Sequence, residues 1–186
     1  ERFSTQVVTF GVGIVLARLL NPTDYGTIAL LTIFTAIAGV LADSGFGNAL
    51  VQKKNATELE FNSVFYLSLG LTSILYAVLF VSAPLVARFY AMPELCKILR
   101  VVSLTLFFNS INSIQNAELN RKLLFHLSFR ISMISTAASA ITGLTLAFTG
   151  YGVWSLVWMT LAGGLVGVLA RWYFIAWRPR LMFSAQ

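Results

Sequence analysis

Charged residues are scarce in this sequence, and their scarcity points to the class of protein. Only 11% of the 186 residues are charged, whereas 58% are hydrophobic, and the mean hydropathy is +0.80. Soluble domains carry about 25% charged residues. The composition therefore argues against a water-soluble globular fold and indicates an integral membrane protein.

Cysteine and histidine are almost absent as well. The chain has one cysteine, Cys96, and one histidine, His126. A single cysteine excludes an internal disulfide, and no Cys/His cluster exists to hold a metal ion. The sequence also has no Walker loop, no nucleophile with an oriented base and no clustered acid–base pair. We therefore expect a protein that is not an enzyme and that uses neither metal nor cofactor.

The net charge of +6 does not indicate a nucleic-acid partner. The basic residues form short clusters between apolar runs, a pattern typical of loops that face anionic lipid and the cytoplasm. No cleavable signal peptide is recognisable. The first residue is Glu1 rather than Met, and an apolar run begins almost at once, so we expect the sequence to be a fragment.

Long apolar runs predict the fold. A helix that spans a bilayer needs about 20 mostly apolar residues. Barrel strands would be about 10 residues long with alternating polarity, which these runs lack. We therefore expect an all-α integral membrane protein, a bundle of six transmembrane helices. The predicted spans are residues 3–20, 25–51, 61–87, 98–117, 131–148 and 153–170.

The distribution of basic residues predicts the orientation. With six spans, both termini lie on one side, together with the loops 49–60 and 119–130. That side carries nine Lys or Arg residues and the opposite side four. The positive-inside rule then places both termini in the cytoplasm.

Several charged residues fall at membrane depth, where a charge is costly. Arg18 ends the first run and either snorkels to the interface or faces a pore. Asp43 lies at a break with the sequence DSGFG and either caps the following helix segment or has a functional or ion-pairing role. Arg88 and Arg100 flank a loop and are expected at the interface. Glu118 is expected to pair with Arg121 or Lys122.

The predicted fourth span carries a polar stripe. Its members recur at spacings of three and four, so they share one helix face. They are Asn109, Asn112, Ser113, Asn116 and Asn120. One interpretation is a hydrogen-bonded seam between helices. The other, which we favour, is the wall of a hydrated cavity that binds sugar hydroxyls, because asparagine offers both donors and acceptors.

Four segments resemble a known family. They are residues 16–26 (LARLLNPTDYG), 43–54 (DSGFGNALVQKK), 150–157 (GYGVWSLV) and 177–184 (WRPRLMFS). In this order they are similar to the first lobe of bacterial polysaccharide biosynthesis membrane proteins. These are the Wzx-type O-antigen, capsule and exopolysaccharide flippases of the multidrug/oligosaccharidyl-lipid/polysaccharide exporter superfamily.

The resemblance implies a function in the bacterial inner membrane. It implies a MATE-like architecture of two six-helix lobes around a central cavity, of which this chain supplies one. It also implies translocation of undecaprenyl-pyrophosphate-linked oligosaccharide by alternating access, with basic cavity residues meeting the pyrophosphate. Arg18 matches such a residue best. The candidate substrate-binding residues are Arg18, Asp43, Asn109, Asn112, Ser113 and Asn116.

Two alternative functions are compatible with the same sequence. One is a cation-coupled small-molecule exporter of the same superfamily, in which Asp43 would bind a proton or sodium ion. The other is a membrane scaffold for a polysaccharide-synthesising complex, in which the asparagine stripe would be buried against a partner helix.

Overall fold

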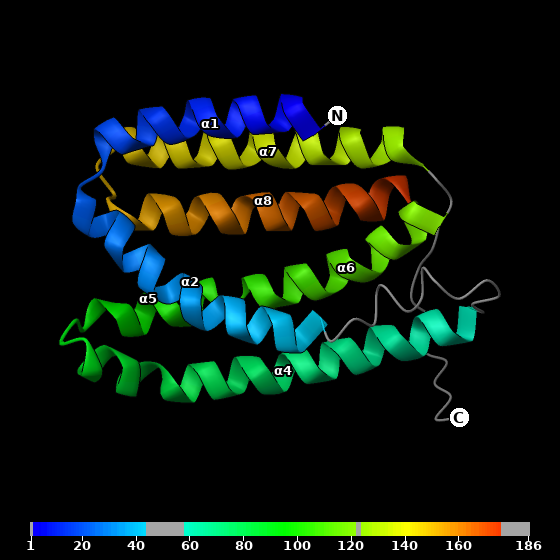
Figure 1. The fold of residues 1–186 in the computed structure, drawn as a ribbon, viewed down its shortest axis with the longest axis horizontal. Helices are drawn as coiled ribbons and strands as arrows, with labels where there is room; N and C mark the ends of the chain where they lie inside the picture. The colour runs from blue at the N-terminus through cyan, green and yellow to red at the C-terminus, as the bar shows by residue number, and fades with distance from the viewer. Residues whose placement is uncertain (1, 44–57, 122–123, 176–186) are drawn as a thin grey trace.

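All the secondary structure in the described part of the chain is helical. The computed structural model describes residues 2–43, 58–121 and 124–175. The helices are α1 (Arg2–Leu19), α2 (Pro22–Asp43), α4 (Glu58–Phe89), α5 (Glu94–Val102), α6 (Thr105–Arg121), α7 (Phe125–Phe148) and α8 (Val153–Phe174). Most of them lie side by side along one direction, and α2 crosses them obliquely (Figure 1).

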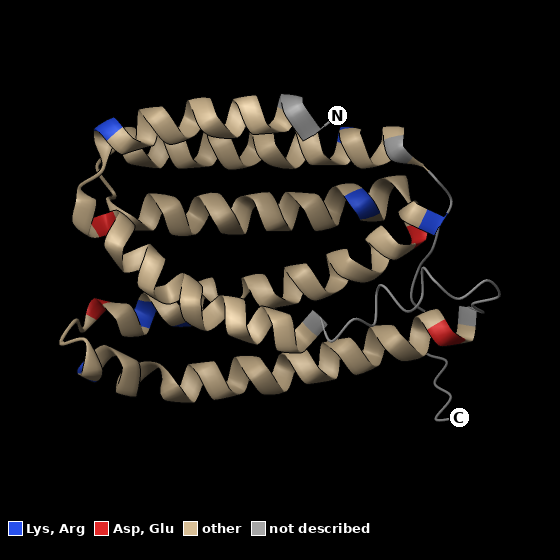
Figure 2. Ribbon diagram, in the orientation of Figure 1, with Lys and Arg blue, Asp and Glu red and all other residues tan. Residues whose placement is uncertain are grey.

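The helix lengths and compositions confirm an all-α integral membrane bundle. Within the described ranges, four stretches have the length and apolar composition to cross a bilayer: Pro22–Ala42, Leu59–Phe89, His126–Phe148 and Val153–Phe174. Charged residues lie mostly at the two ends of the bundle, and its middle is nearly free of them (Figure 2). This distribution keeps charge near the interfaces, where its cost is lowest.

The expected span 98–117 lies across two helices. α5 ends at Val102 and α6 begins at Thr105. At the break, Ser103 Oγ donates to the Leu99 carbonyl at 2.6 Å, and Thr105 Oγ1 donates to the Val102 carbonyl at 2.7 Å. Such hydroxyls compete with the helical backbone for its carbonyls. The Leu104 and Leu106 amides bond three residues back, so the chain tightens into a 3₁₀ turn there.

The two largest of five apolar clusters among the described residues join most of the helices. One joins α2, α4, α5 and α8 through residues that include Leu31, Ala83, Ile98 and Val157. The other, around Leu16, joins α1 to α7 and includes Val12, Leu20, Ala140 and Ala147. α7 and α8 approach closely because small residues face each other, and Ser139 Oγ donates to the Met159 carbonyl at 2.8 Å.

Residues 16–26 and 150–157 meet at one end of the bundle (Figure 1). Pro22 occupies the first position of α2, and the Asp24 carboxylate accepts a hydrogen bond from the Asn21 amide at 3.1 Å, as in a capping box. A Cβ at Gly152 would lie 3.4 Å from Asp24 Oδ1, and Gly152 has φ +53°. The two motifs therefore form one joint between the α1–α2 and α7–α8 turns, which requires glycine at position 152.

Pro84 lies inside α4, and Arg100 compensates for it. Proline has no N–H, so the Phe80 carbonyl, four residues earlier, loses its helical donor. Arg100 Nε on α5 donates to that carbonyl at 3.3 Å, and the guanidinium carbon lies 4.1 Å from the centre of the Phe80 ring. Arg100 therefore satisfies a carbonyl that would otherwise face lipid unpaired, which is costly.

Replacing Arg100 with alanine is expected to lower the free energy of unfolding by about 1–3 kcal/mol, because the Phe80 carbonyl is left without a donor. Alanine at Pro84 restores the missing N–H, so Arg100→Ala in a Pro84→Ala background is expected to cost at least about 1 kcal/mol less. Denaturant unfolding in micelles measures the difference. Lys97→Ala, an exposed position on the same helix, serves as the control. Additive effects at 84 and 100 would contradict the assignment.

Candidate functional site: an amide-lined cavity backed by arginine

The polar stripe of α6 faces a cavity between α2 and α6. The cavity, which we call the amide cavity, has a volume of about 490 Å³. The α2 side chains that line it are small and apolar. Its lining residues are Ala36, Gly39, Val40 and Ala42 from α2, and Leu106, Asn109, Ser110, Asn112, Ser113 and Asn116 from α6. Four residues predicted as substrate-binding therefore line one cavity.

Arg171 on α8 contacts the stripe from behind. Its Nη1 donates to Asn112 Oδ1 at 2.9 Å. Its Nε and Nη2 donate to Asn116 Oδ1 at 3.3 and 3.1 Å. A fourth bond runs from Nη1 to the Gly167 carbonyl at 3.3 Å. None of these acceptors carries a formal charge, so they hold the guanidinium without neutralising it.

The amide side chains thus have the geometry of both interpretations, and sugar binding by the cavity stays a prediction. Asn112 and Asn116 form hydrogen bonds between helices, and the same residues line a cavity. Asn109 is exposed and lines the amide cavity one turn of α6 away. The fifth member of the stripe, Asn120, is exposed and is not among the lining residues.

Two more cavities extend the polar surface. The first, which we call the hydroxyl cavity, has a volume of about 420 Å³ and lies between α2, α6 and α8. It shares Ala36, Gly39 and Asn109 with the amide cavity. The other has a volume of about 280 Å³ between α1, α7 and α8, and it shares Thr160 and Gly164 with the hydroxyl cavity. The three cavities therefore adjoin one another, and we call them together the polar groove, after the amides and hydroxyls that recur along its otherwise largely apolar walls.

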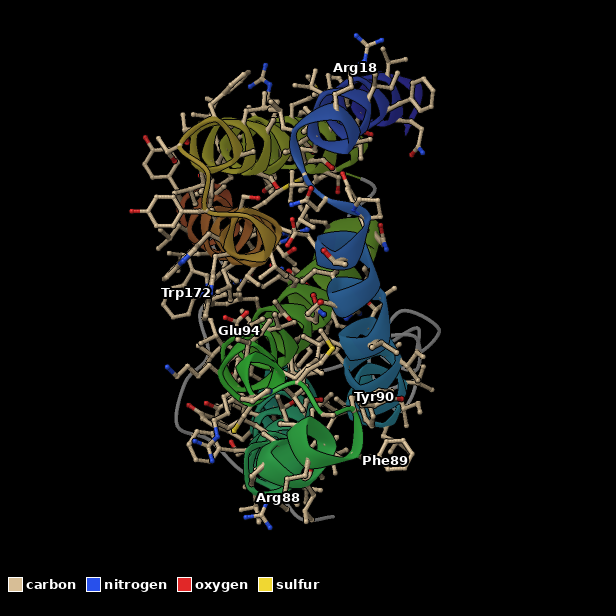
Figure 3. All side chains as sticks on the ribbon, turned by 90° about the vertical axis from the view of Figure 1, so that its left-hand side faces the viewer. Arg18, Arg88, Phe89, Tyr90, Glu94 and Trp172 are labelled. Atoms are coloured by element: carbon tan, nitrogen blue, oxygen red, sulfur yellow. The ribbon has the colours of Figure 1, made fainter. Side chains whose placement is uncertain are left out.

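The other two predicted site residues lie elsewhere. Arg18 is exposed at the end of α1, and its side chain points away from the other helices (Figure 3). It lines none of the three cavities. Asp43 is the last residue of α2, and its side chain lies outside the described residues. A substrate-binding role for either residue stays a prediction.

Arg171 was not among the predicted site residues, because its sequence context is typical of an interfacial anchor. It lies in the last turn of α8 beside Trp172, whose side chain points away from the bundle (Figure 3). The sequence does contain one hint of this role, a glycine one helical turn before Arg171. Gly167 precedes Arg171 by one helical turn, and a Cβ there would lie 3.2 Å from Arg171 Nη1. Glycine leaves the space that the guanidinium occupies on its way to α6.

These features define a class of protein. The chain is a multi-pass α-helical membrane protein whose polar side chains gather along a groove between helices, with an arginine behind one wall. Polar side chains that face the interior of a membrane bundle mark substrate or ion pathways.

The chain belongs to the family described as polysaccharide biosynthesis protein, which matches residues 15–186. This membership confirms the resemblance drawn from the four sequence segments. It places the chain among polysaccharide biosynthesis proteins.

Similar curated proteins share that theme in their names. The chain is 29% identical over 182 residues to the succinoglycan biosynthesis transport protein ExoT of Rhizobium meliloti (strain 1021). It is 26% identical over 188 residues to the lipopolysaccharide biosynthesis protein WzxC of Escherichia coli (strain K12). Each match covers 96% of this chain but only 37% of the relative. The teichuronic acid biosynthesis protein TuaB of Bacillus subtilis (strain 168) is 28% identical over 72% of the chain and 27% of its own length. No solved structure matches the chain.

Proposed function

We propose that this chain forms one lobe of a flippase that moves undecaprenyl-pyrophosphate-linked oligosaccharide across the bacterial inner membrane. The glycan would cross in the polar groove while the lipid tail stays in or beside the bilayer. A second six-helix lobe would close the groove, and the two lobes would alternate access to it. Both termini of this segment would face the cytoplasm, where the excess of basic residues lies.

One observation carries the proposal: the amide cavity in a chain of this family. Asn112 and Asn116 place hydrogen-bonding groups on the wall of a cavity. A helix face that contacted lipid would carry apolar side chains at these positions instead. A helix seam would need only the bonds to Arg171 and no space beside them. A cavity of about 490 Å³ is within the usual range for sites that bind small molecules.

Translocation by the purified full-length protein, with both lobes present, tests the proposal. In proteoliposomes, a lipid-linked oligosaccharide added to one leaflet is expected to become accessible to a glycosidase on the other side. Replacing Asn109 and Asn112 together with leucine is expected to slow this transfer at least about tenfold, because the wall loses its hydrogen-bonding groups.

The matched control is Ser73→Ala, which removes an exposed hydroxyl of α4 that bonds only to the Leu69 carbonyl of its own helix. Transfer by this variant is expected to equal that of the unaltered protein. A protein that catalyses no transfer, yet binds enzymes of polysaccharide synthesis, would favour the scaffold function instead.

A further inference from the structure

Arg171 determines which way two amides of the cavity wall point. Arginine has donors and no acceptor, so it can bond only to the oxygen of an asparagine amide. Asn112 Oδ1 and Asn116 Oδ1 both accept from Arg171. The other arm of each planar amide is the NH₂ group, which is turned away from Arg171. Two side chains that could otherwise present either face therefore present donors to the amide cavity.

The threonines of the hydroxyl cavity have the opposite hydrogen-bonding character, and the one amide in its lining, Asn109, is shared with the amide cavity. Thr32, Thr35, Thr105 and Thr160 line it, and each donates its hydroxyl proton to a backbone carbonyl, at distances from 2.7 to 3.3 Å. A hydroxyl that has donated its proton has only lone pairs left to offer. The third cavity continues this pattern with Thr9, Ser135 and Ser139.

We propose that the groove is polarised: the amide cavity binds an oxyanion, and the hydroxyl cavity binds neutral sugar hydroxyls. The oxyanion is a phosphate or carboxylate group of the transported glycolipid, so this inference rests on the proposed function. Asn112 and Asn116 are the binding residues. Arg171 is a positioning residue, because it does not line the cavity and acts through the two amides.

Physical chemistry favours this division. Fixed N–H donors suit a group that carries only acceptors, and hydrogen bonds to a charged group are about twice as strong as neutral ones. The Arg171 charge, held by neutral acceptors, adds attraction for an anion in a region of low dielectric constant. A neutral sugar hydroxyl can donate to the threonine oxygens, which themselves offer an oxyanion no donor. The substrate therefore has one preferred direction along the groove.

The test measures protection of introduced cysteines from a neutral maleimide, in nanodiscs and with Cys96 replaced by serine. Ser113→Cys reports on the amide cavity and Thr35→Cys on the hydroxyl cavity. The ligands are undecaprenyl pyrophosphate, glucuronate and glucose, which separate a lipid phosphate from a sugar carboxylate and from a neutral sugar. At least one anion is expected to protect position 113 at a concentration at least about tenfold lower than glucose does.

Substitutions then separate donor chemistry from shape. Asn112→Asp and Asn116→Asp keep the size and the contact with Arg171 but replace N–H donors with an oxygen. Each is expected to weaken protection of position 113 by the anion at least about tenfold. Protection of position 35 by glucose is expected to stay unchanged. Arg171→Lys, which keeps a charge and a donor, is expected to retain more of the anion preference than Arg171→Met.

Equal protection of position 113 by glucose and both anions would overturn the inference, as would full protection in both aspartate variants. Transport by the unaltered protein would still support the flippase function in either case. Conversely, the protein could show the expected anion preference and yet move no lipid-linked oligosaccharide. That result would support the polarised groove and contradict the flippase function.

Discussion

Replacing Arg171 with methionine is expected to reduce oligosaccharide transfer at least about tenfold while changing thermal stability little. The variant loses three bonds to α6, each contributing about 0.6 kcal/mol between membrane helices, or about 2 kcal/mol together. It also removes a charge whose insertion costs about 2.5–3.5 kcal/mol at the bilayer centre and less near a helix end. The two effects on stability are similar in size and opposite in sign.

Oligosaccharide transfer by Arg171→Met is expected to fall even though the two effects on stability cancel. Without Arg171, the Asn112 and Asn116 amides are free to rotate, and the positive charge behind the wall is gone. Transfer in proteoliposomes and the thermal unfolding temperature in micelles measure the two effects separately. Phe174→Leu, in the same last turn of α8 but outside the three cavities, is the control for transfer. Transfer within twofold of the unaltered protein would show that Arg171 is only a structural link.

The part of the site that lies on a single helix could be predicted from the sequence. Asn109, Asn112, Ser113 and Asn116 recur with helical spacing, so their common face follows from local geometry alone. The cavity that they line depends on how α2 crosses α6, which no local pattern encodes. Hydropathy likewise identified the membrane class and the long apolar helices, because both depend on the hydropathy of consecutive residues averaged along the chain.

The rest of the site and fold depends on contacts between distant segments. Arg171 lies 55 and 59 residues from its two partners, so its role is invisible to any window of sequence. Arg100 and the Phe80 carbonyl are 20 residues apart. The break at Ser103 was missed for a different reason: the flanking residues are apolar, and a hydropathy average does not register a change from α-helical to 3₁₀ bonding.

Replacing Gly164 with alanine is expected to lower the free energy of unfolding, because the added Cβ would overlap Phe108. An added Cβ would lie 2.7 Å from Phe108 Cδ2 and 3.3 Å from Phe108 Cβ. Rotation of the ring cannot relieve the second contact, because Cβ moves only with the α6 backbone. Overpacking of this kind costs about 1–3 kcal/mol. Denaturant unfolding measures the cost, and valine at the same position is expected to cost more.

A second substitution tests whether Phe108 is the side chain with which the added Cβ clashes. Phe108→Ala leaves the ring's space empty, so Gly164→Ala is expected to cost less in that background than alone. Gly11→Ala is the matched control, since a Cβ at that exposed position of α1 meets nothing within 4 Å. It is expected to leave stability unchanged or raise it slightly, because alanine favours the helix.

The same substitution also links packing to the site. Gly164 lies seven residues before Arg171 on α8, two turns away on the same face, and Phe108 precedes Asn112 by one turn of α6. Moving α6 away from α8 at Phe108 therefore lengthens the bonds from Arg171 to Asn112 and Asn116. Anion protection of Ser113→Cys is expected to weaken in Gly164→Ala and to recover with Phe108→Ala. Unaltered protection in a destabilised Gly164→Ala variant would show that the arginine and its amides hold their geometry independently of this contact.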